Sequence, residues 1–164
     1  MGDKTWNVLF ICTGNSARSI LAEGLMNSLG APRFTAYSAG SHPTGVVNPF
    51  ALEALTALRI PTDGFRSKNW DEFAKPEAPS LDFVFTVCDQ AAGEMCPVWI
   101  GHPMTAHWGV ADPAAVKGSD AEKRQRFRDT AVTLKRRIGL MLALPIERLD
   151  AMAIQHEVRS IGSR

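Results

Sequence analysis

A cysteine and an arginine near the start of the chain frame a short polar segment. Cys12 opens the segment, Arg18 closes it, and the residues between them are small or prone to turns. A thiolate is a nucleophile, and a guanidinium binds oxyanions through paired hydrogen bonds. The two residue types therefore indicate nucleophilic attack on a tetrahedral oxyanion. The spacing alone is a weak signal, so the elements that hold the pair must support it.

The residues on either side of this segment predict a strand before it and a helix after it. Residues 6–11 end in a continuous apolar run, which is typical of a strand buried on both faces of a parallel sheet. After Arg18, apolar and small residues recur every three or four positions, as they do along a helix. Such a helix directs its free N–H groups and its positive dipole end at the loop. We expect an anion site there, with Cys12 favoured as the thiolate.

The loop itself supplies groups that fit an oxyanion. Backbone N–H groups of residues 13–18 are expected to hold the oxygens, with Arg18 as a charged clamp. Ser19 is predicted to donate a hydrogen bond to the Cys12 thiolate, and Asn15 to hold the loop by bonding its own backbone. A free cysteine can also be merely a small apolar residue of the core. The predicted oxyanion-binding residues are Thr13, Gly14, Asn15, Ser16, Ala17, Arg18 and Ser19.

Attack by a thiolate also requires an acid that protonates the departing oxygen. Asp112 follows an aromatic-containing segment and precedes Pro113 in a stretch expected to be a loop. A partly desolvated carboxyl at that place would serve as the general acid. An Asp-Pro pair is more often a simple turn, so the significance of Asp112 depends on Cys12.

Strands and helices alternate along the remaining chain. The further predicted strands lie at residues 34–38, 81–87 and 96–99, and residues 102–113 are expected to be irregular. The predicted helices begin at Asn48-Pro49, at a capping box over residues 119–122, and at Ile146. This order predicts an α/β fold, a single three-layer domain with a central, mostly parallel four-stranded sheet flanked by helices. Residues 1–144 are expected to form its body and 145–164 a C-terminal helical extension.

The bulk composition is that of a globular protein. The chain has 164 residues, of which 45% are hydrophobic and 21% charged, and its net charge of +1 gives no argument for a nucleic-acid partner. No signal peptide or membrane-spanning run is recognisable, so we expect a cytoplasmic protein without membrane contact. Three cysteines without a secretory signal favour catalytic or redox roles over a disulfide framework.

These motifs together resemble the low-molecular-weight protein tyrosine phosphatase superfamily, and within it the arsenate reductases of the thioredoxin-coupled type. The resemblance covers about residues 7–142. It is carried by LFICTGNSARS, AYSAGSHP, DFVFTVC, Cys96-Pro97, and His107-Trp108-Gly109 followed by Asp112-Pro113.

The resemblance implies that three thiols reduce arsenate to arsenite for detoxification of arsenic. Cys12 would attack arsenate, while Arg18 and the loop amides stabilise the oxyanion and Asp112 protonates the departing hydroxide. Cys88 would then attack Cys12 and release arsenite, and Cys96 would attack Cys88 to leave a disulfide for thioredoxin. No tightly bound cofactor is implied. A related branch uses glutathione or mycothiol with glutaredoxin-like partners, so the electron donor stays open.

Some family members also bind a potassium ion beside the loop. The positions of this chain that match that ion site are Asn15, Glu23, Ser38 and Asp71. Glu23 equally suits a simple role in complementing the helix dipole.

Two other functions remain open at this point. The same Cys12, Arg18 and Asp112 would serve a phosphatase of phosphotyrosine or aryl phosphates, because phosphate, sulfate and arsenate share a shape. Residues 114–116 lack the aromatic side chains that phosphatases of this fold place near the acid. A non-catalytic oxyanion sensor is the third possibility, but it would need neither Asp112 nor the outer cysteines.

Overall fold

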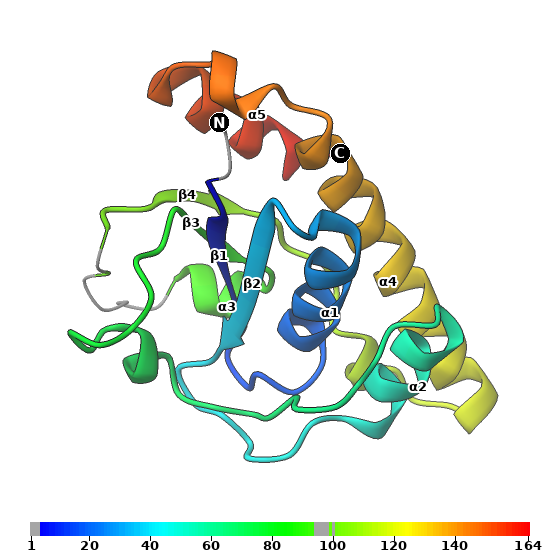
Figure 1. Ribbon diagram of the computed structural model, residues 1–164. Coiled ribbons are helices and arrows are strands. Elements are labelled where there is room, and N and C mark those ends of the chain that lie inside the picture. Colours follow the sequence, from blue (N-terminus) through cyan, green and yellow to red (C-terminus); the bar gives the residue numbers. More distant parts are fainter. Residues whose placement is uncertain (1–3, 94–98, 100) are drawn as a thin grey trace.

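The structure, a computed structural model, describes residues 4–93, 99 and 101–164. Its sheet has four strands that pair in parallel in the order β2-β1-β3-β4 (Figure 1). The strands are β1 (Trp6–Ile11), β2 (Phe34–Ala39), β3 (Phe83–Thr86) and β4 (Met104–His107). The predicted α/β fold with a central four-stranded sheet is confirmed.

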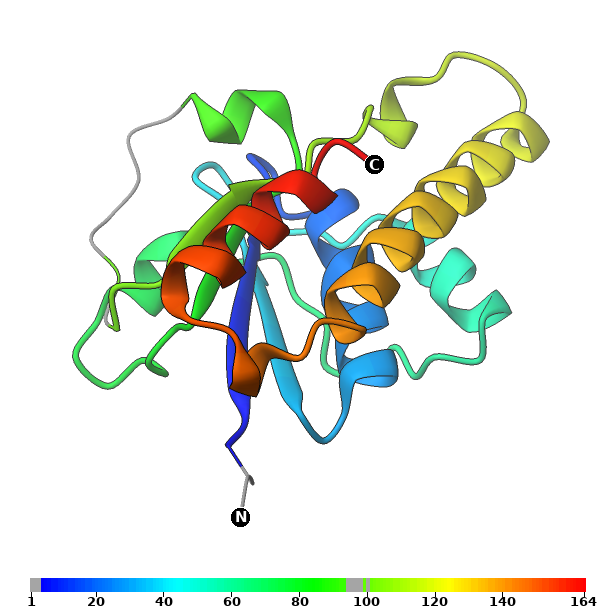
Figure 2. The ribbon, with the colours of Figure 1, turned by 90° about the horizontal axis from the view of Figure 1, so that it is seen from above.

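Helices cover both faces of this sheet. Figures 1 and 2 show α1, α2 and α4 together on one side, with α3 and the turn η1 on the other. The last helix, α5, packs against β4 and α4. The α-helices are α1 (Arg18–Gly30), α2 (Pro49–Ala57), α3 (Asp89–Ala92), α4 (Asp120–Leu142) and α5 (Ala151–Ile161). The 3₁₀ turns are η1 (Trp70–Phe73), η2 (Pro113–Ala115) and η3 (Ile146–Arg148).

An aromatic cluster fixes the centre of the sheet against the helices. Phe10 of β1 and Phe85 of β3 are register partners, and Trp108 stacks on Phe85 with ring centroids 4.2 Å apart. All three side chains are fully buried. The indole Nε1 of Trp108 donates to the carbonyl of Val158 in α5 at 2.8 Å, so the buried polar atom is satisfied. The cluster thereby anchors the C-terminal residues on the sheet.

The capping signals in the sequence mark two helix starts correctly. Asn48 accepts a hydrogen bond from the N–H of Phe50 and begins α2, as predicted. Ser119 and Glu122 form the predicted capping box of α4. The apolar stripe that this helix buries consists of Phe127, Ala131, Leu134, Ile138 and Met141.

Two predictions about secondary structure differ from the structure. The stretch 102–113 was expected to be irregular, but Met104–His107 forms β4 at the edge of the sheet. The sequence of that strand, MTAH, has no apolar run, because only Ala106 is buried. Pairing with β3 supplies the order of the strand. The fourth strand predicted at 96–99 falls largely outside the described residues. The predicted final helix is divided, because Asp150 caps a new helix after η3.

Residues 145–164 pack onto the body of the fold through η3 and α5. Ile146, Ile154 and Val158 are buried in the same core as the sheet. The division of the chain at residue 145 remains a prediction. No helix in the described part of the chain is long and apolar enough to cross a membrane.

Candidate active site

The backbone of the loop after β1 is held from its outer side. Carbonyl groups of the loop accept hydrogen bonds from the segment 42–48, which runs around it. These bonds are His42 N to Thr13 O at 2.9 Å, Thr44 N to Gly14 O at 3.0 Å, and Asn48 N to Ser16 O at 2.9 Å. Carbonyls held on the outer side favour amide N–H groups on the inner side, as an anion cradle requires, although the Thr13 amide donates to Cys88.

Helix α1 begins at the end of this loop with its first turn open. Ala17 stands at the N-cap position and makes no side-chain hydrogen bond to the helix. A serine or aspartate at that position would occupy the first N–H groups. The alanine leaves them available to an anion at the positive end of the helix dipole.

Gly40, just after β2, lets a second stretch of backbone approach the loop closely. A Cβ atom at this position would collide with the carbonyl oxygens of Cys12 and Thr13. Both are backbone atoms and cannot move aside like a flexible side chain. The AGS stretch of the sequence therefore serves to bring β2 up to the nucleophile.

Gly40→Ala is expected to lower the free energy of unfolding by about 2 kcal/mol, because the methyl group overpacks a rigid contact. Urea unfolding would measure the change. Gly139→Ala in α4 is the matched control, since nothing lies within 4 Å of a Cβ there. We expect that substitution to be neutral or stabilising. Equal stability of the two variants would contradict the proposed contact.

A chain of side-chain hydrogen bonds leads to the sulfur of Cys12. The Oγ of Ser19 lies 2.9 Å from the Cys12 Sγ and accepts a hydrogen bond from Asn15 Nδ2 at 2.8 Å. Because Ser19 accepts from Asn15, its own hydroxyl hydrogen is available to the sulfur. This is the arrangement that would stabilise a thiolate at Cys12.

The prediction that the Asn15 side chain bonds its own backbone is wrong, because its bonds reach Ser19 and Lys68. Its Oδ1 accepts from the N–H of Lys68 at 2.9 Å, and its backbone has a left-handed φ of 42°. Asparagine tolerates that conformation better than most residues. The partner comes from a segment 53 residues further along the chain, which no local pattern could reveal. Asn15 is fully buried, so this bond fixes the loop to its surroundings.

The structure brings Arg18 and Asp112 together. Arg18 Nη2 lies 3.7 Å from Asp112 Oδ2, and Arg18 Nη1 donates to the carbonyl of Val110 at 3.2 Å. The other carboxylate oxygen of Asp112 accepts from the N–H of Ala114 at 3.0 Å and caps η2. Arg18 and Asp112 line one pocket of about 490 Å³ together with Cys88. A charged clamp, a carboxyl and a second thiol thus share one cavity.

Cys88 lies at the carboxyl end of β3 and is buried. Its sulfur accepts hydrogen bonds from the N–H of Thr13 at 3.3 Å and from the N–H of Ala91 at 3.4 Å. Thr13 directly follows Cys12, so the second thiol borders the loop of the first. Both are free thiols. Cys96 lies outside the described residues.

His107 also lies in this region, and the sequence did not predict its contacts with Thr86 and Asp89. Its Nε2 lies 2.7 Å from Asp89 Oδ1, and its Nδ1 lies 2.8 Å from Thr86 Oγ1. The ring therefore ties the first residue of α3 to the ends of β3 and β4. A side chain at the carboxyl end of a parallel strand is a candidate for such a role, but β4 itself was not predicted.

Arg137 of α4 holds the backbone that leads from β4 to Asp112. It is buried in α4 and donates to the carbonyls of Trp108 at 2.8 Å and Gly109 at 3.1 Å. Burial lowers the pKa of its guanidinium from the usual value. Because these two carbonyls accept its hydrogen bonds, the guanidinium of Arg137 is satisfied although it is buried.

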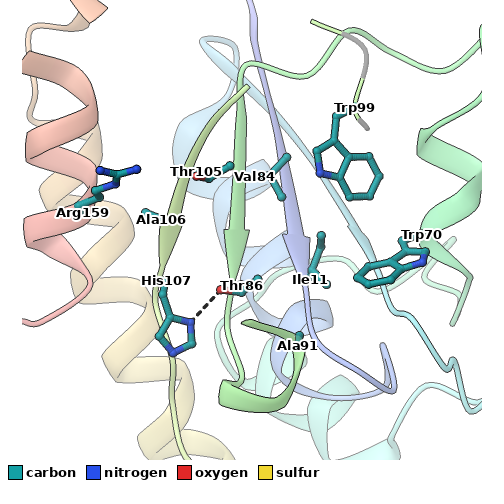
Figure 3. Close-up of a pocket in the computed structure, with 10 residues that line it drawn as sticks. All are labelled: Ile11, Trp70, Val84, Thr86, Ala91, Trp99, Thr105, Ala106, His107 and Arg159. Atoms are coloured by element: carbon teal, nitrogen blue, oxygen red, sulfur yellow. Dashed lines mark hydrogen bonds between the residues drawn. The ribbon is translucent and has the colours of Figure 1, made fainter. Parts of the chain in front are cut away.

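A second pocket of about 490 Å³ lies over the face of the sheet that α3 and η1 cover (Figure 3). Ile11, Val84 and Thr86 form part of its lining, with Trp70 and Trp99 beside them. Its lining includes neither described cysteine, nor Arg18, nor Asp112. We therefore assign the oxyanion chemistry to the pocket lined by Arg18, Cys88 and Asp112.

The residues matched to a potassium site do not fit a cation. Glu23 and Ser38 do meet, with Ser38 Oγ donating to Glu23 Oε1 at 2.5 Å, but Asp71 is exposed on η1. The Lys68 ammonium lies 3.9 Å from the same carboxylate oxygen and donates to the carbonyl of Arg66 at 2.9 Å. A potassium ion at Glu23 would therefore face a buried positive charge. Among the described residues no cluster of three or more His, Cys, Asp or Glu side chains suits a metal.

Comparison with known proteins shows the family of this chain. The family described as low molecular weight phosphotyrosine protein phosphatase matches residues 7–157. A curated arsenate reductase from Halalkalibacterium halodurans is 36% identical over 131 residues, which cover 80% of this chain and 91% of the relative.

Solved structures show the same fold. An arsenate reductase in an oxidized state matches with a TM-score of 0.67 and 25% identity, covering 84% of this chain and 96% of its own. A low molecular weight protein tyrosine phosphatase from T. tengcongensis matches with a TM-score of 0.65 and 25% identity, covering 88% and 100%. The chain therefore belongs to the low molecular weight phosphotyrosine protein phosphatase family.

Proposed function

We propose that this protein is an arsenate reductase, which converts arsenate to arsenite with its own thiols as the immediate reductants. The observation that carries the proposal is the position of Cys88. Its sulfur lies within hydrogen-bonding distance of the N–H of Thr13, the residue that follows Cys12. Hydrolysis of a phosphate ester needs one thiol, whereas a two-electron reduction needs two. The curated relative named arsenate reductase supports the same reaction.

Binding and the first covalent step take place at the loop. The amides of residues 14–18 and the Arg18 guanidinium hold three oxygens of arsenate, while the Thr13 amide donates to Cys88 and the Cys12 thiolate attacks arsenic. Asp112 gives a proton to the departing oxygen, which leaves as water from a singly protonated arsenate oxygen. The product is a covalent Cys12–arsenic(V) adduct.

The redox step follows when the Cys88 thiolate attacks the Cys12 sulfur. A Cys12–Cys88 disulfide forms, the sulfur–arsenic bond breaks, and its electron pair stays on arsenic, which leaves as arsenite. Two thiol sulfurs are oxidised and arsenic is reduced by two electrons. Cys96 then attacks Cys88, restoring the Cys12 thiolate and leaving a Cys88–Cys96 disulfide.

Thioredoxin is the proposed reductant of that disulfide, because a third thiol that takes over the oxidation frees Cys12 and presents a protein disulfide. Glutathione with glutaredoxin, or mycothiol, would instead reduce an adduct or disulfide directly. Free thiols at these positions require a reducing compartment, so we place the protein in the cytoplasm.

The deciding experiment measures arsenite formation by the purified protein with two electron-donor systems. One contains thioredoxin and its reductase, and the other contains glutaredoxin and glutathione. We expect turnover with thioredoxin. A second candidate function, aryl-phosphate hydrolysis, is favoured by the phosphatase of the same fold and by the Cys12, Arg18 and Asp112 set. Rapid hydrolysis of an aryl phosphate without arsenite formation in either system would establish the phosphatase instead.

Asp112→Asn should reduce arsenite formation by about 10²- to 10³-fold, because the amide cannot donate the proton that the leaving oxygen needs. The loop and Arg18 remain, so inorganic phosphate should still bind and inhibit. The measurement is kcat at saturating arsenate. Asp129→Asn, at an exposed position of α4, is the control. An unchanged kcat in the Asp112 variant would remove Asp112 from the mechanism.

A further inference from the structure

We propose that the buried Lys68 ammonium takes the place of a bound potassium ion. By pairing with Glu23 it fixes the segment whose backbone orients Asn15 in the oxyanion loop. Lys68 is thus a positioning residue that acts through Asn15 and Ser19. The inference rests on the proposed role of residues 12–19 in oxyanion binding.

The ammonium is enclosed by groups that complement its charge. Its side chain is only 8% exposed, and the facing Glu23 side chain is 17% exposed. Glu23 Oε1 also accepts from Ser38 at the end of β2, so one carboxylate joins α1, β2 and the segment that carries Lys68. Burial raises the pKa of Glu23 and lowers the pKa of Lys68, and each residue's charge opposes the shift of the other.

The neighbouring Arg66 is paired with a different carboxylate, although its charge also opposes the rise that burial causes in the pKa of Glu23. Arg66 forms a two-pronged ion pair with Glu72, with nitrogen–oxygen distances of 2.6 and 3.0 Å. Its carbonyl oxygen accepts from Lys68 Nζ. Lys68 therefore remains the cation assigned to Glu23 among the described residues of this segment.

The same residue reaches the nucleophile through its backbone. The Lys68 N–H donates to Asn15, whose amide donates to Ser19, whose hydroxyl lies against the Cys12 sulfur. Ser19 and Glu23 are four residues apart on α1 and thus lie on the same face of that helix. Fixing the Lys68 side chain to Glu23 therefore fixes the backbone N–H that orients Asn15.

Glu23 also lines a surface pocket of about 320 Å³, together with Gly24 and Asn27. In a variant that lacks the lysine side chain, we expect a small cation from solvent to reach the Glu23 carboxylate from this pocket. This makes the role of the charge separable from the role of the side chain's volume.

The test compares Lys68→Ala, Lys68→Met and the exposed control Lys75→Ala in a Cys88→Ser/Cys96→Ser background, in which Cys12 is the remaining thiol. The readout is protection of Cys12 from iodoacetamide by inorganic phosphate, which requires no arsenate turnover. Each protein is measured in potassium chloride, in methylammonium chloride and in choline chloride at equal ionic strength, with circular dichroism as the check on folding.

Phosphate affinity of the parent and of Lys75→Ala should be the same in both salts. Lys68→Ala should lose on the order of tenfold in choline, because the loop is misplaced, and should regain affinity in potassium or methylammonium chloride. Lys68→Met should lose as much and regain nothing, since its side chain fills the space without a charge.

Other results would overturn the inference. They are a parent protein that needs potassium, a Lys68→Met variant that binds like the parent, or a Lys68→Ala loss that no small cation repairs. Absence of phosphate protection in the parent would instead refute the proposed oxyanion loop, so the two failures can be told apart.

Discussion

Replacing Cys12 with serine should reduce arsenite formation by at least about 10⁴-fold, since the hydroxyl is far less nucleophilic than a thiolate and cannot form the disulfide. The change is small in volume, and Ser19 and Asn15 remain in place to bond the new hydroxyl. Phosphate binding should therefore persist, within a few-fold of the parent. Steady-state assays of arsenite, combined with phosphate titration by calorimetry, would measure both effects.

A Cys12→Ser protein that still forms arsenite with thioredoxin would place the nucleophile elsewhere. A variant that has lost phosphate binding as well would be uninformative on its own, so its unfolding transition is compared with that of the parent. Cys12 is almost fully buried in the core, so a lowered unfolding transition would assign a loss of phosphate binding to folding and not to the loop.

Replacing Cys88 with serine should separate the two chemistries that this fold supports. Arsenite formation should fall by about 10³-fold or more, because nothing remains to attack the Cys12 sulfur and release arsenic in its reduced state. Any hydrolysis of an aryl phosphate should continue, since the loop, Arg18 and Asp112 are intact. The measurement is the ratio of the two activities in the same preparation.

The hydrogen bonds to Cys88 make this comparison fair. A serine hydroxyl at the same place can accept from the N–H of Thr13 and of Ala91, as the sulfur does. Undiminished turnover of Cys88→Ser with glutathione and glutaredoxin would show that an external thiol performs the second attack, and the relay within the chain would be refuted. Parallel loss of both activities would indicate damage to the loop.

Local signals in the sequence were enough to predict the frame of the site. An apolar run, a polar turn and helical spacing predicted β1, the loop and α1, and capping residues marked the starts of α2 and α4. These features depend on neighbours within a few residues. The closeness of Arg18 to Asp112 was implied by family resemblance, and the structure now gives the ion-pair distance of 3.7 Å.

The parts that the sequence did not predict depend on contacts between distant segments. β4 has little apolar content of its own and owes its order to β3. Lys68 stands on a segment that looks like an ordinary charged loop, yet it is buried because Glu23 of α1 faces it. His107 gains its partners only where β3 and β4 end and α3 begins. Such contacts are set by the whole fold and leave no local pattern.

The outward bonds of the loop carbonyls have a consequence for selectivity inside a cell. A cradle fastened by the segment 42–48 before any ligand arrives cannot reshape itself to distinguish two oxyanions of the same charge and nearly the same size. Phosphate would then compete with arsenate for the loop at every encounter. Discrimination must arise after binding, because arsenic in the adduct with Cys12 accepts two electrons when the Cys12–Cys88 disulfide forms and phosphorus does not. The protein would therefore select its substrate by redox chemistry and tolerate phosphate as a reversible competitor.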